Sequence, residues 1–244
     1  MKLISLNVWG GKLNKPLLEF LGKNQDVDFF LFQEMHHNAT ENTNWSNDGN
    51  SNLFEDIKNV LPEHDGYFAP AQNDEYGLAG FVKKEVKVSE SGDIFIHGHK
   101  DAMKYRQGGT IGRNLQYFKI DAPKPYTLLN FHGLWTGQGK KDTEDRIKQS
   151  NKIVEFTRSI SEDYVLAGDF NLLPDTESIK ILESMNVRNL IKDYGITNTR
   201  TSYYTRTTDK FADYIFTTSG LEVKDFKILP DEVSDHAAMY LEFE

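Results

Sequence analysis

Several short apolar runs, each bounded by polar residues, constrain this chain more than any other feature of its sequence. The clearest are residues 28–33 (DFFLFQ), 126–132 (YTLLNFH) and 163–167 (DYVLA). A continuous apolar run of about four to eight residues is typical of a strand that is buried on both faces. Such strands need cover from other layers, so we predict a layered α/β structure.

Other segments predict the elements that surround these strands. Further strands are expected at residues 2–9, 77–83, 115–120, 213–217 and 239–243. Helices are expected at residues 16–21, 53–61, 142–160 and 176–185. No internal repeat and no linker rich in Pro or Gly divides the chain. We therefore expect a single domain over residues 1–244, with many strands and few helices.

Charge and cysteine content narrow the range of functions. The chain has 28 Lys and Arg against 37 Asp and Glu, a formal net charge of −9. Polyanions repel an acidic chain at long range, which argues against tight, sequence-independent binding of duplex DNA. A small or single-stranded phosphate ester is as plausible a substrate as duplex DNA for a chain with this charge. The sequence has no Cys, which excludes disulfides, thiolate catalysis and zinc–thiolate sites.

The N-terminal segment gives an expectation about location. Its apolar run is interrupted by Asn7 and by the Gly10-Gly11 pair, which makes it too short for a signal-peptide core. No apolar span elsewhere is long enough to cross a membrane. We expect a cytoplasmic monomer with no transmembrane segment and no protein partner; removal of an earlier signal peptide would instead indicate secretion.

Candidate ligands for a divalent cation follow two of the predicted strands. Asn7 interrupts the apolar run where the first strand ends, and Glu34 follows the strand at residues 28–33. A buried carboxylate must be paired or bind a metal, and amide and carboxylate oxygens suit Mg²⁺ or Mn²⁺. Taken alone, Asn7 could equally complete a turn, and Glu34 could be a surface charge.

Two further strands end in groups suited to contact with phosphate or water. His132 closes the strand at residues 126–132, where it could touch a phosphate or serve only in the structure. Asp169 and Asn171 follow the strand at residues 163–167 in the segment GDFN. Being two residues apart, they would face the same way in extended geometry. An ordinary turn rich in Asp and Asn is the alternative interpretation.

A carboxylate and an imidazole lie together before the last predicted strand. Asp235 and His236 are adjacent in the segment SDH, and the imidazole has an ordinary pKa of about 6.5, which suits acid–base chemistry at neutral pH. Asp213, at the start of another strand, could accept the second N–H of that ring and orient it. Turn and surface polarity would also explain all three residues.

The order of these motifs carries more information than any one of them. LNxW, QE, NxHG, GDFN, ADYI and SDH occur in this order over nearly the whole chain. This order closely resembles the endonuclease/exonuclease/phosphatase superfamily, which includes pancreatic-type deoxyribonucleases, abasic-site endonucleases, neutral sphingomyelinases, inositol-polyphosphate phosphatases and poly(A) deadenylases. The resemblance implies a four-layer α/β sandwich, with two mixed β-sheets packed face to face and helices outside. Trp9 departs from the pattern of the abasic-site endonucleases.

The resemblance implies binding roles for five residues. Asn7, Glu34 and Asp235 would be metal-site residues for Mg²⁺ or Mn²⁺. His132 would contact the phosphate that is hydrolysed, and Arg113 resembles the arginine with which the family contacts that phosphate.

The resemblance also implies catalytic and supporting roles. Asp169 and Asn171 would activate water and orient the phosphate, and Asp213 and His236 would act as a coupled carboxylate–imidazole pair. Glu75 would lie near the substrate and orient His132.

These expectations describe a metal-dependent phosphoesterase, with a phosphodiesterase or nuclease as the first hypothesis. A sphingomyelinase-like or inositol-phosphate phosphatase-like enzyme is the alternative, and a phosphate-binding module without catalysis is the third. The basic segment at residues 137–141 (GQGKK) could grip a phosphate or stack against a base, but it lacks the full pattern of a nucleotide-binding phosphate loop.

Overall fold

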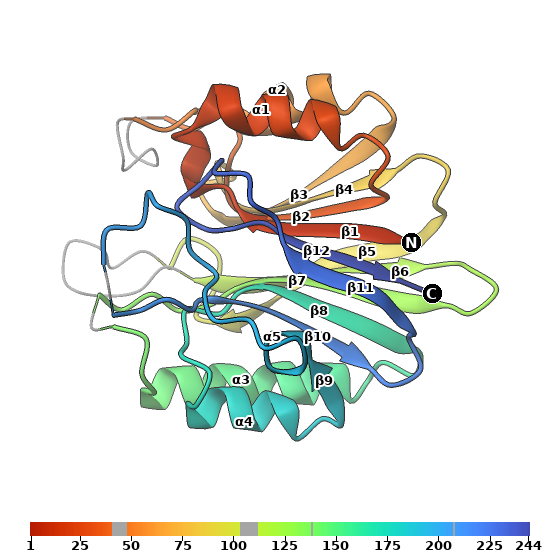
Figure 1. Cartoon of the computed structure of the whole chain (residues 1–244), viewed down its shortest axis with the longest axis vertical. Coiled ribbons are helices and arrows are strands. Elements are labelled where there is room, and N and C mark those ends of the chain that lie inside the picture. The colour runs from red at the N-terminus through yellow and green to blue at the C-terminus, as the bar shows by residue number, and fades with distance from the viewer. Residues whose placement is uncertain (41–47, 103–111, 138, 207) are drawn as a thin grey trace.

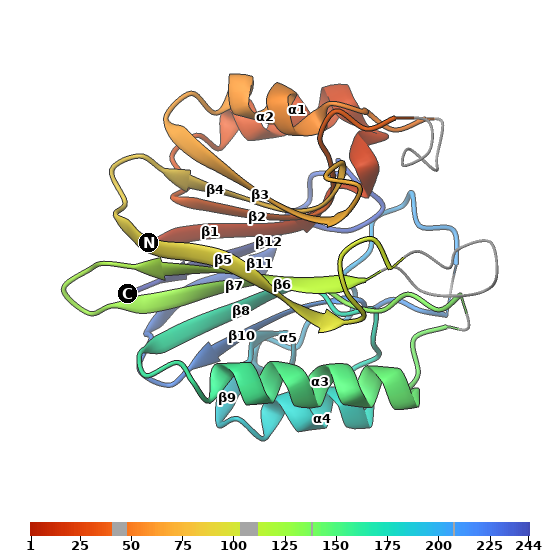
Figure 2. The same ribbon diagram turned by 180° about the vertical axis from the view of Figure 1, so that it is seen from behind.

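Two six-stranded mixed sheets pack face to face, and helices cover their outer faces (Figure 1, Figure 2). The computed structural model describes residues 1–40, 48–102, 112–137, 139–206 and 208–244. The first sheet has the strand order β11-β12-β1-β2-β4-β3, and the second has the order β5-β6-β7-β8-β10-β9. The predicted four-layer sandwich of two mixed sheets flanked by helices is confirmed.

The elements have the following bounds. The first sheet contains β1 (Lys2–Asn7), β2 (Phe29–His36), β3 (His64–Gln72), β4 (Tyr76–Lys83), β11 (Val223–Ile228) and β12 (Met239–Phe243). The second contains β5 (Val88–His97), β6 (Arg113–Ile120), β7 (Tyr126–His132), β8 (Asp163–Asp169), β9 (Val187–Asn189) and β10 (Asp213–Thr218). The helices are η1 (Trp9–Gly11), α1 (Asn14–Lys23), α2 (Leu53–Val60), α3 (Glu144–Thr157), α4 (Glu177–Glu183) and α5 (Leu190–Asp193). No helix in these described parts is long and apolar enough to cross a membrane.

The apolar run of β2 explains why this strand is buried on both faces. Its side chains alternate, so Phe29 and Leu31 join the core that includes the second sheet, while Phe30 and Phe32 pack in the cluster beneath α1 and α2. Both faces are therefore removed from water, as the continuous apolar sequence predicts.

All eight strands predicted from the sequence are present, but several predicted ends were wrong. The first strand ends at Asn7 instead of residue 9, because Trp9 has a positive φ of 52° and begins the short helix η1. The strand predicted to end at Gln33 continues to His36. The helix predicted at residues 142–160 begins after Thr143, whose hydroxyl caps it, and ends at Thr157.

A layer of buried amide side chains joins the two sheets. Gln33 of β2 donates a hydrogen bond to Oδ1 of Asn130 on β7 at 2.7 Å. Nδ2 of Asn130 lies 3.1 Å from the backbone oxygens of Phe32 and Ala79, and also 3.1 Å from Oε1 of Gln116. The Phe32 and Ala79 oxygens lie where the β2–β4 register shifts, so Asn130 supplies a donor at an irregular point of the first sheet.

Candidate active site

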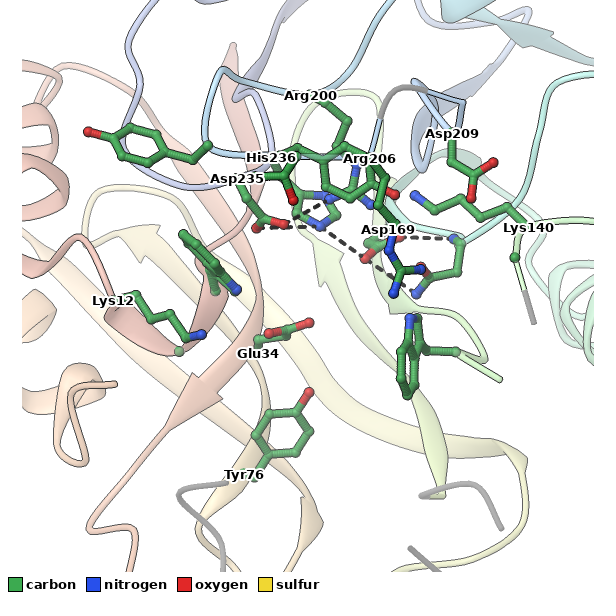
Figure 3. Close-up of a pocket in the computed structure, with 18 of the residues that line it drawn as sticks. Lys12, Glu34, Tyr76, Lys140, Asp169, Arg200, Arg206, Asp209, Asp235 and His236 are labelled. Atoms are coloured by element: carbon green, nitrogen blue, oxygen red, sulfur yellow. Dashed lines mark hydrogen bonds and ion pairs between the residues drawn. The ribbon is translucent and has the colours of Figure 1, made fainter. Parts of the chain in front are cut away.

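A pocket of about 520 Å³ opens at the end of the sandwich where β1, β2, β7 and β8 finish (Figure 3). The two termini lie towards the opposite end (Figure 1). Parallel pairing of β1 with β2, and of β7 with β8, brings the carboxyl ends of these strands to one edge. Polar residues that follow the central strands of both sheets therefore meet in one place, as the sequence predicted.

A bulge in β2 aims Glu34 into this pocket. The pairing of β2 with β4 shifts register between Phe32 and Met35, and Glu34 takes a positive φ of 58°. Positive φ is costly for a residue with a side chain and is often found at functional sites. Glu34 lies partly exposed in the pocket, and burial of its surroundings raises the pKa of its carboxyl above the usual value.

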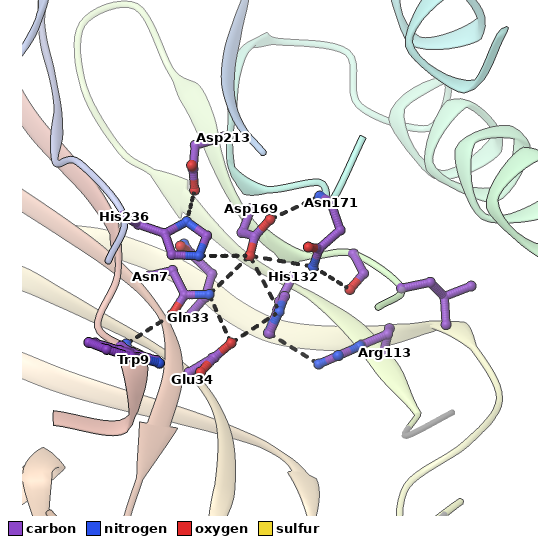
Figure 4. Close-up of polar contacts among 12 residues, drawn as sticks. Asn7, Trp9, Gln33, Glu34, Arg113, His132, Asp169, Asn171, Asp213 and His236 are labelled. Carbon is purple, nitrogen blue, oxygen red and sulfur yellow. Dashed lines mark hydrogen bonds and ion pairs between the residues drawn. The ribbon is translucent and has the colours of Figure 1, made fainter. Parts of the chain in front are cut away.

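Asn7 links the two sheets through its side-chain amide. Its Nδ2 lies 3.0 Å from Oε1 of Glu34 and 3.0 Å from Oδ2 of Asp169, and its Oδ1 accepts a hydrogen bond from the backbone N–H of Trp9 at 2.9 Å. The amide nitrogen therefore faces the carboxylates (Figure 4).

Asp235 lies next to His236, in the segment that precedes β12. Its Oδ2 forms an ion pair with Nη1 of Arg200 at 3.3 Å. Its Oδ1 is buried and accepts no hydrogen bond from the described residues. Nε2 of His236 lies 3.9 Å from this oxygen, beyond hydrogen-bond distance, so the oxygen can still accept a ligand that supplies positive charge.

Arg113 sets the protonation state of His132. Nη1 of Arg113 lies 3.1 Å from Nδ1 of His132, and an arginine can only donate, so Nδ1 is the acceptor. Burial, together with the Arg113 charge, lowers the pKa of His132 well below its usual value. The ring is therefore neutral and carries its proton on Nε2, which lies 3.8 Å from Oε1 of Glu34 and 3.6 Å from Oδ2 of Asp169.

Asp169 is the centre of the polar network (Figure 4). Its carboxylate accepts a hydrogen bond from the backbone N–H of Asn171 at 2.9 Å and lies 3.6 Å from Nε2 of both imidazoles. Burial favours the neutral acid, but the surrounding positive groups, His236 foremost, hold its pKa below the usual range. Asn171 also lines the pocket, through a turn with φ of 54° instead of the extended geometry predicted for it.

Asp213 holds the second imidazole. Its Oδ1 lies 2.8 Å from Nδ1 of His236, and its Oδ2 accepts a hydrogen bond from the hydroxyl of Thr199 at 2.9 Å. β10 pairs with β8 so that Asp213 lies opposite Asp169. Burial disfavours a charged ring, yet Asp213 and Asp169 together raise the pKa of His236 above its usual value.

Glu75 contacts the segment that follows β2. It precedes β4, and its carboxylate accepts hydrogen bonds from the backbone N–H and the hydroxyl of Thr40, both at 2.9 Å. The ring nitrogens of His132 face Arg113, Glu34 and Asp169. A role for Glu75 in orienting His132 stays a prediction.

Several residues at the pocket wall were missed by the sequence interpretation. They are basic and aromatic: Trp9, Lys12, Tyr76, Trp135, Arg200, Tyr203, Tyr204 and Arg206. The alternation of Arg with Tyr in residues 200–206 (RTSYYTR), shortly before ADYI, is the signal that could have revealed four of them. Lys140, from the predicted basic segment, also lines the pocket; residue 138 of that segment lies outside the described residues.

The sequence profile of the Endonuclease/Exonuclease/phosphatase family matches residues 4–236. The chain belongs to this family. The match spans every residue placed in the polar network above, and it assigns the chain to the phosphoesterases. No curated protein matches the sequence.

Solved structures with the same fold are distant in sequence. An endonuclease/exonuclease/phosphatase from Bacteroides vulgatus is 19% identical with a TM-score of 0.76, covering 100% of this chain and 98% of that one. The mannosyl-6-phosphatase of Bacteroides thetaiotaomicron is 17% identical with a TM-score of 0.76, covering 100% and 99%. TDP2 from D. rerio, complexed with a single-strand DNA product, is 16% identical with a TM-score of 0.74, covering 100% and 98%.

Proposed function

We propose that this protein is a divalent-metal-dependent phosphodiesterase that acts on a nucleotide-type or single-stranded substrate. The observation that carries the proposal is the meeting of two kinds of group in one pocket. Carboxylates suited to a cation, Glu34 and Asp235, lie beside a buried ionised carboxylate, Asp169, and a neutral imidazole held by an arginine, His132. Such a set can polarise a phosphate and activate water.

The residues present fit Mg²⁺ or Mn²⁺. Glu34 and Asp235 would hold the ion, since Oδ1 of Asp235 is a buried oxygen with no donor among the described residues and carboxylate oxygens suit hard cations. Asn7 would add a ligand oxygen only after its side-chain amide rotates, because its nitrogen Nδ2 now faces Glu34. Asp169 also belongs to two groups whose ligand atoms lie within 4.8 Å of one another, one with Glu34 and His132 and the other with Asp213 and His236. When bound, the cation would supply positive charge to a phosphate oxygen.

Asp169 is the proposed acceptor of the proton from the attacking water. It remains ionised although it is buried, which a general base requires. His236 is the alternative base, because its Nε2 lies 3.6 Å from Oδ2 of Asp169 and Asp213 fixes its orientation. Both assignments depend on the same three connected side chains, Asp169, His236 and Asp213.

Arg113, His132 and Asn171 are the proposed contacts of the scissile phosphate. Arg113 supplies a positively charged guanidinium, and Nε2 of His132 supplies a neutral donor directed into the site. Donors placed where negative charge develops lower the barrier most. Asn171 would add an amide from the turn after β8.

The pocket wall supports a compact substrate with a ring. Trp135 and Tyr203 are each 45% exposed, although both line the pocket, so they are available for stacking. The basic wall, in a chain with a net charge of −9, favours a small anionic ester over a long duplex. A phosphatase acting on a sugar or inositol phosphate is the second candidate, because such a substrate is also a small anionic ester. Monomeric state and cytoplasmic location remain predictions.

The test is hydrolysis of a panel after metal removal with EDTA and restoration of Mg²⁺ or Mn²⁺. The panel comprises bis-p-nitrophenyl phosphate, p-nitrophenyl phosphate, single- and double-stranded DNA, RNA, an inositol phosphate and sphingomyelin. We expect metal-restored cleavage of the diester and of single-stranded nucleic acid, lost in Asp169→Asn. Preference for a monoester or sphingomyelin would favour the alternatives, and no cleavage with either metal would contradict the proposal.

A further inference from the structure

Two buried cations lie beside one tyrosine ring on the wall of the pocket. Lys140 and Arg200 are only 5% and 8% exposed. Nζ of Lys140 lies 5.5 Å from the ring centre of Tyr204, and Cζ of Arg200 lies 4.2 Å from the same centre. Burying cations is costly unless they are paired, so their neighbours matter.

Carboxylates lie near these cations, but few are within ion-pair distance of them. Asp235 pairs with one edge of Arg200, but no described carboxylate lies within ion-pair distance of Lys140 or of Arg206. Nζ of Lys140 donates to the backbone oxygen of Phe211 at 2.9 Å. Burial, and next the Arg200 charge, lower the pKa of Lys140 to about 8, which still leaves it mostly protonated at neutral pH.

The backbone holds both cations in place. The guanidinium of Arg146 is buried and donates to the backbone oxygens of Leu134 at 3.0 Å and Lys141 at 2.5 Å, which fixes the segment that carries Lys140. The backbone oxygen of Lys140 accepts from Leu173 at 3.0 Å. Arg200 forms an isolated β-bridge with His236. These contacts fix the backbone at Lys140 and at Arg200.

These cations and Arg113 lie beside different members of the polar network. Arg113 extends from β6 to His132, whereas Arg200, Lys140 and Arg206 lie around His236 and Asp169, across the pocket from Lys12 (Figure 3). Asp209 also lies on this side of the pocket. Asp169, Asp213 and Asp209 all act electrostatically on Lys140. Asp169 and Asp213 are themselves paired with His236, and none of the three lies within ion-pair distance of Lys140, so an anionic ligand could still approach this side chain.

We propose that Lys140, Arg200 and Arg206 form a second anion-binding subsite, so that the preferred substrate carries a phosphate or carboxylate in addition to the phosphate that is hydrolysed. This inference rests on the proposed function, because it assigns the substrate class of the same pocket. The second anion would be bound by charge-assisted hydrogen bonds, which are stronger than neutral ones.

The first experiment compares two substrates that differ by one phosphate. A p-nitrophenyl ester of thymidine monophosphate, and the same ester with a phosphate added on its free sugar hydroxyl, are hydrolysed by the Mg²⁺-loaded enzyme. We expect kcat/KM to be about 10- to 100-fold higher for the doubly phosphorylated ester, the scale of one charge-assisted hydrogen bond. Equal values would overturn the subsite.

Variants test whether the preference for the doubly phosphorylated ester comes from Lys140, Arg200 and Arg206. Arg206→Gln, at an exposed position, should lower the ratio of the two kcat/KM values about tenfold. Lys140→Gln should do the same if it folds, and Arg206→Gln alone suffices if it does not. Lys12→Gln removes a cation from the opposite side and should keep the ratio. A ratio that falls equally in Lys12→Gln would contradict the assignment.

A binding measurement separates this inference from the proposed function. Thymidine monophosphate and thymidine bisphosphate are titrated into the protein in EDTA by isothermal titration calorimetry. Tighter binding of the bisphosphate, weakened by Arg206→Gln, supports the subsite even if neither ester is hydrolysed. Hydrolysis of the simple ester without any bisphosphate preference in kinetics or binding overturns the subsite and leaves the proposed function standing.

Glucose bisphosphate and glucose monophosphate, titrated in the same way, identify the source of the second anion. Tighter binding of the bisphosphate in both the sugar pair and the nucleotide pair supports a subsite that recognises the second anion alone. A preference in the nucleotide pair only supports the subsite with an added contribution from stacking on the exposed rings of Trp135 and Tyr203.

Discussion

Replacing Asn130 by Leu should lower the free energy of unfolding by more than the loss of one hydrogen bond would, because the Asn130 side chain bonds to several buried groups. Both side chains branch at Cγ into two heavy atoms, so the change removes polar partners without opening a cavity. It leaves the oxygens of Phe32 and Ala79 without their Nδ2 donor and removes the acceptor of Gln33. A buried polar group left unsatisfied costs about 1–3 kcal/mol, so we expect a loss of about 3 kcal/mol in the free energy of unfolding.

The expected loss can be measured by calorimetry or urea unfolding in EDTA. For a chain of this size about 1 kcal/mol changes Tm by roughly 2–4 °C, so Asn130→Leu should lower Tm by about 6–12 °C. Thr127→Val is the matched control on the same strand, because it removes one hydrogen bond to the partly exposed Glu162. Its loss should be about 1 kcal/mol or less. A Tm change in Asn130→Leu no larger than in Thr127→Val would refute this reasoning.

Three other variants test the site and its support. Asp213→Asn should reduce turnover by the order of 10²–10⁴-fold in a metal-loaded assay. Asp213 and Asp169 outweigh burial and raise the pKa of His236, so the stability that this variant loses in EDTA should be greatest below about pH 6.5 and should shrink as pH rises through the folded-state pKa of His236. A loss of stability that does not depend on pH would argue against the pairing of Asp213 with His236. Gly168→Ala should prevent folding or lower Tm strongly, since a Cβ there would lie 2.0 Å from the backbone oxygen of Phe131 at a φ of 147°; wild-type stability by circular dichroism would contradict this. Arg146→Met should leave two carbonyl oxygens without donors and lower Tm by about 4–12 °C, whereas an unchanged melting curve would count against its role as an anchor.

Strands inside the sheets could be predicted from the sequence, whereas strands at the edges could not. The eight predicted strands are the eight inner ones, and the four missed strands, β3, β5, β9 and β11, are the edges of the two sheets. An edge strand has one unpaired side and can carry Gly, Pro and charged residues. β5 (VSESGDIFIH) and β11 (VKDFKI) are mostly exposed or half-buried, so they lack the continuous apolar run that indicates a buried strand.

The polar network of the site was predicted in outline because its members follow inner strands. Asp169 and Asp213 were found for this reason, and they lie opposite each other on paired strands. The bulge that turns Glu34 inward could not be predicted, since it depends on how β2 pairs with β4. Lys140 and Arg200 lie outside regular elements, where no periodicity relates sequence to position, and only the folded chain brings them to the same tyrosine.

The division of the pocket between two sheets has a consequence for folding. Asn7 and Glu34 belong to the first sheet, and His132 and Asp169 belong to the second. A folding intermediate with only one sheet formed would have much of its secondary structure but no complete set of reacting groups. Recovery of hydrolysis during refolding should therefore follow the docking of the two sheets, while circular dichroism follows the formation of each sheet separately.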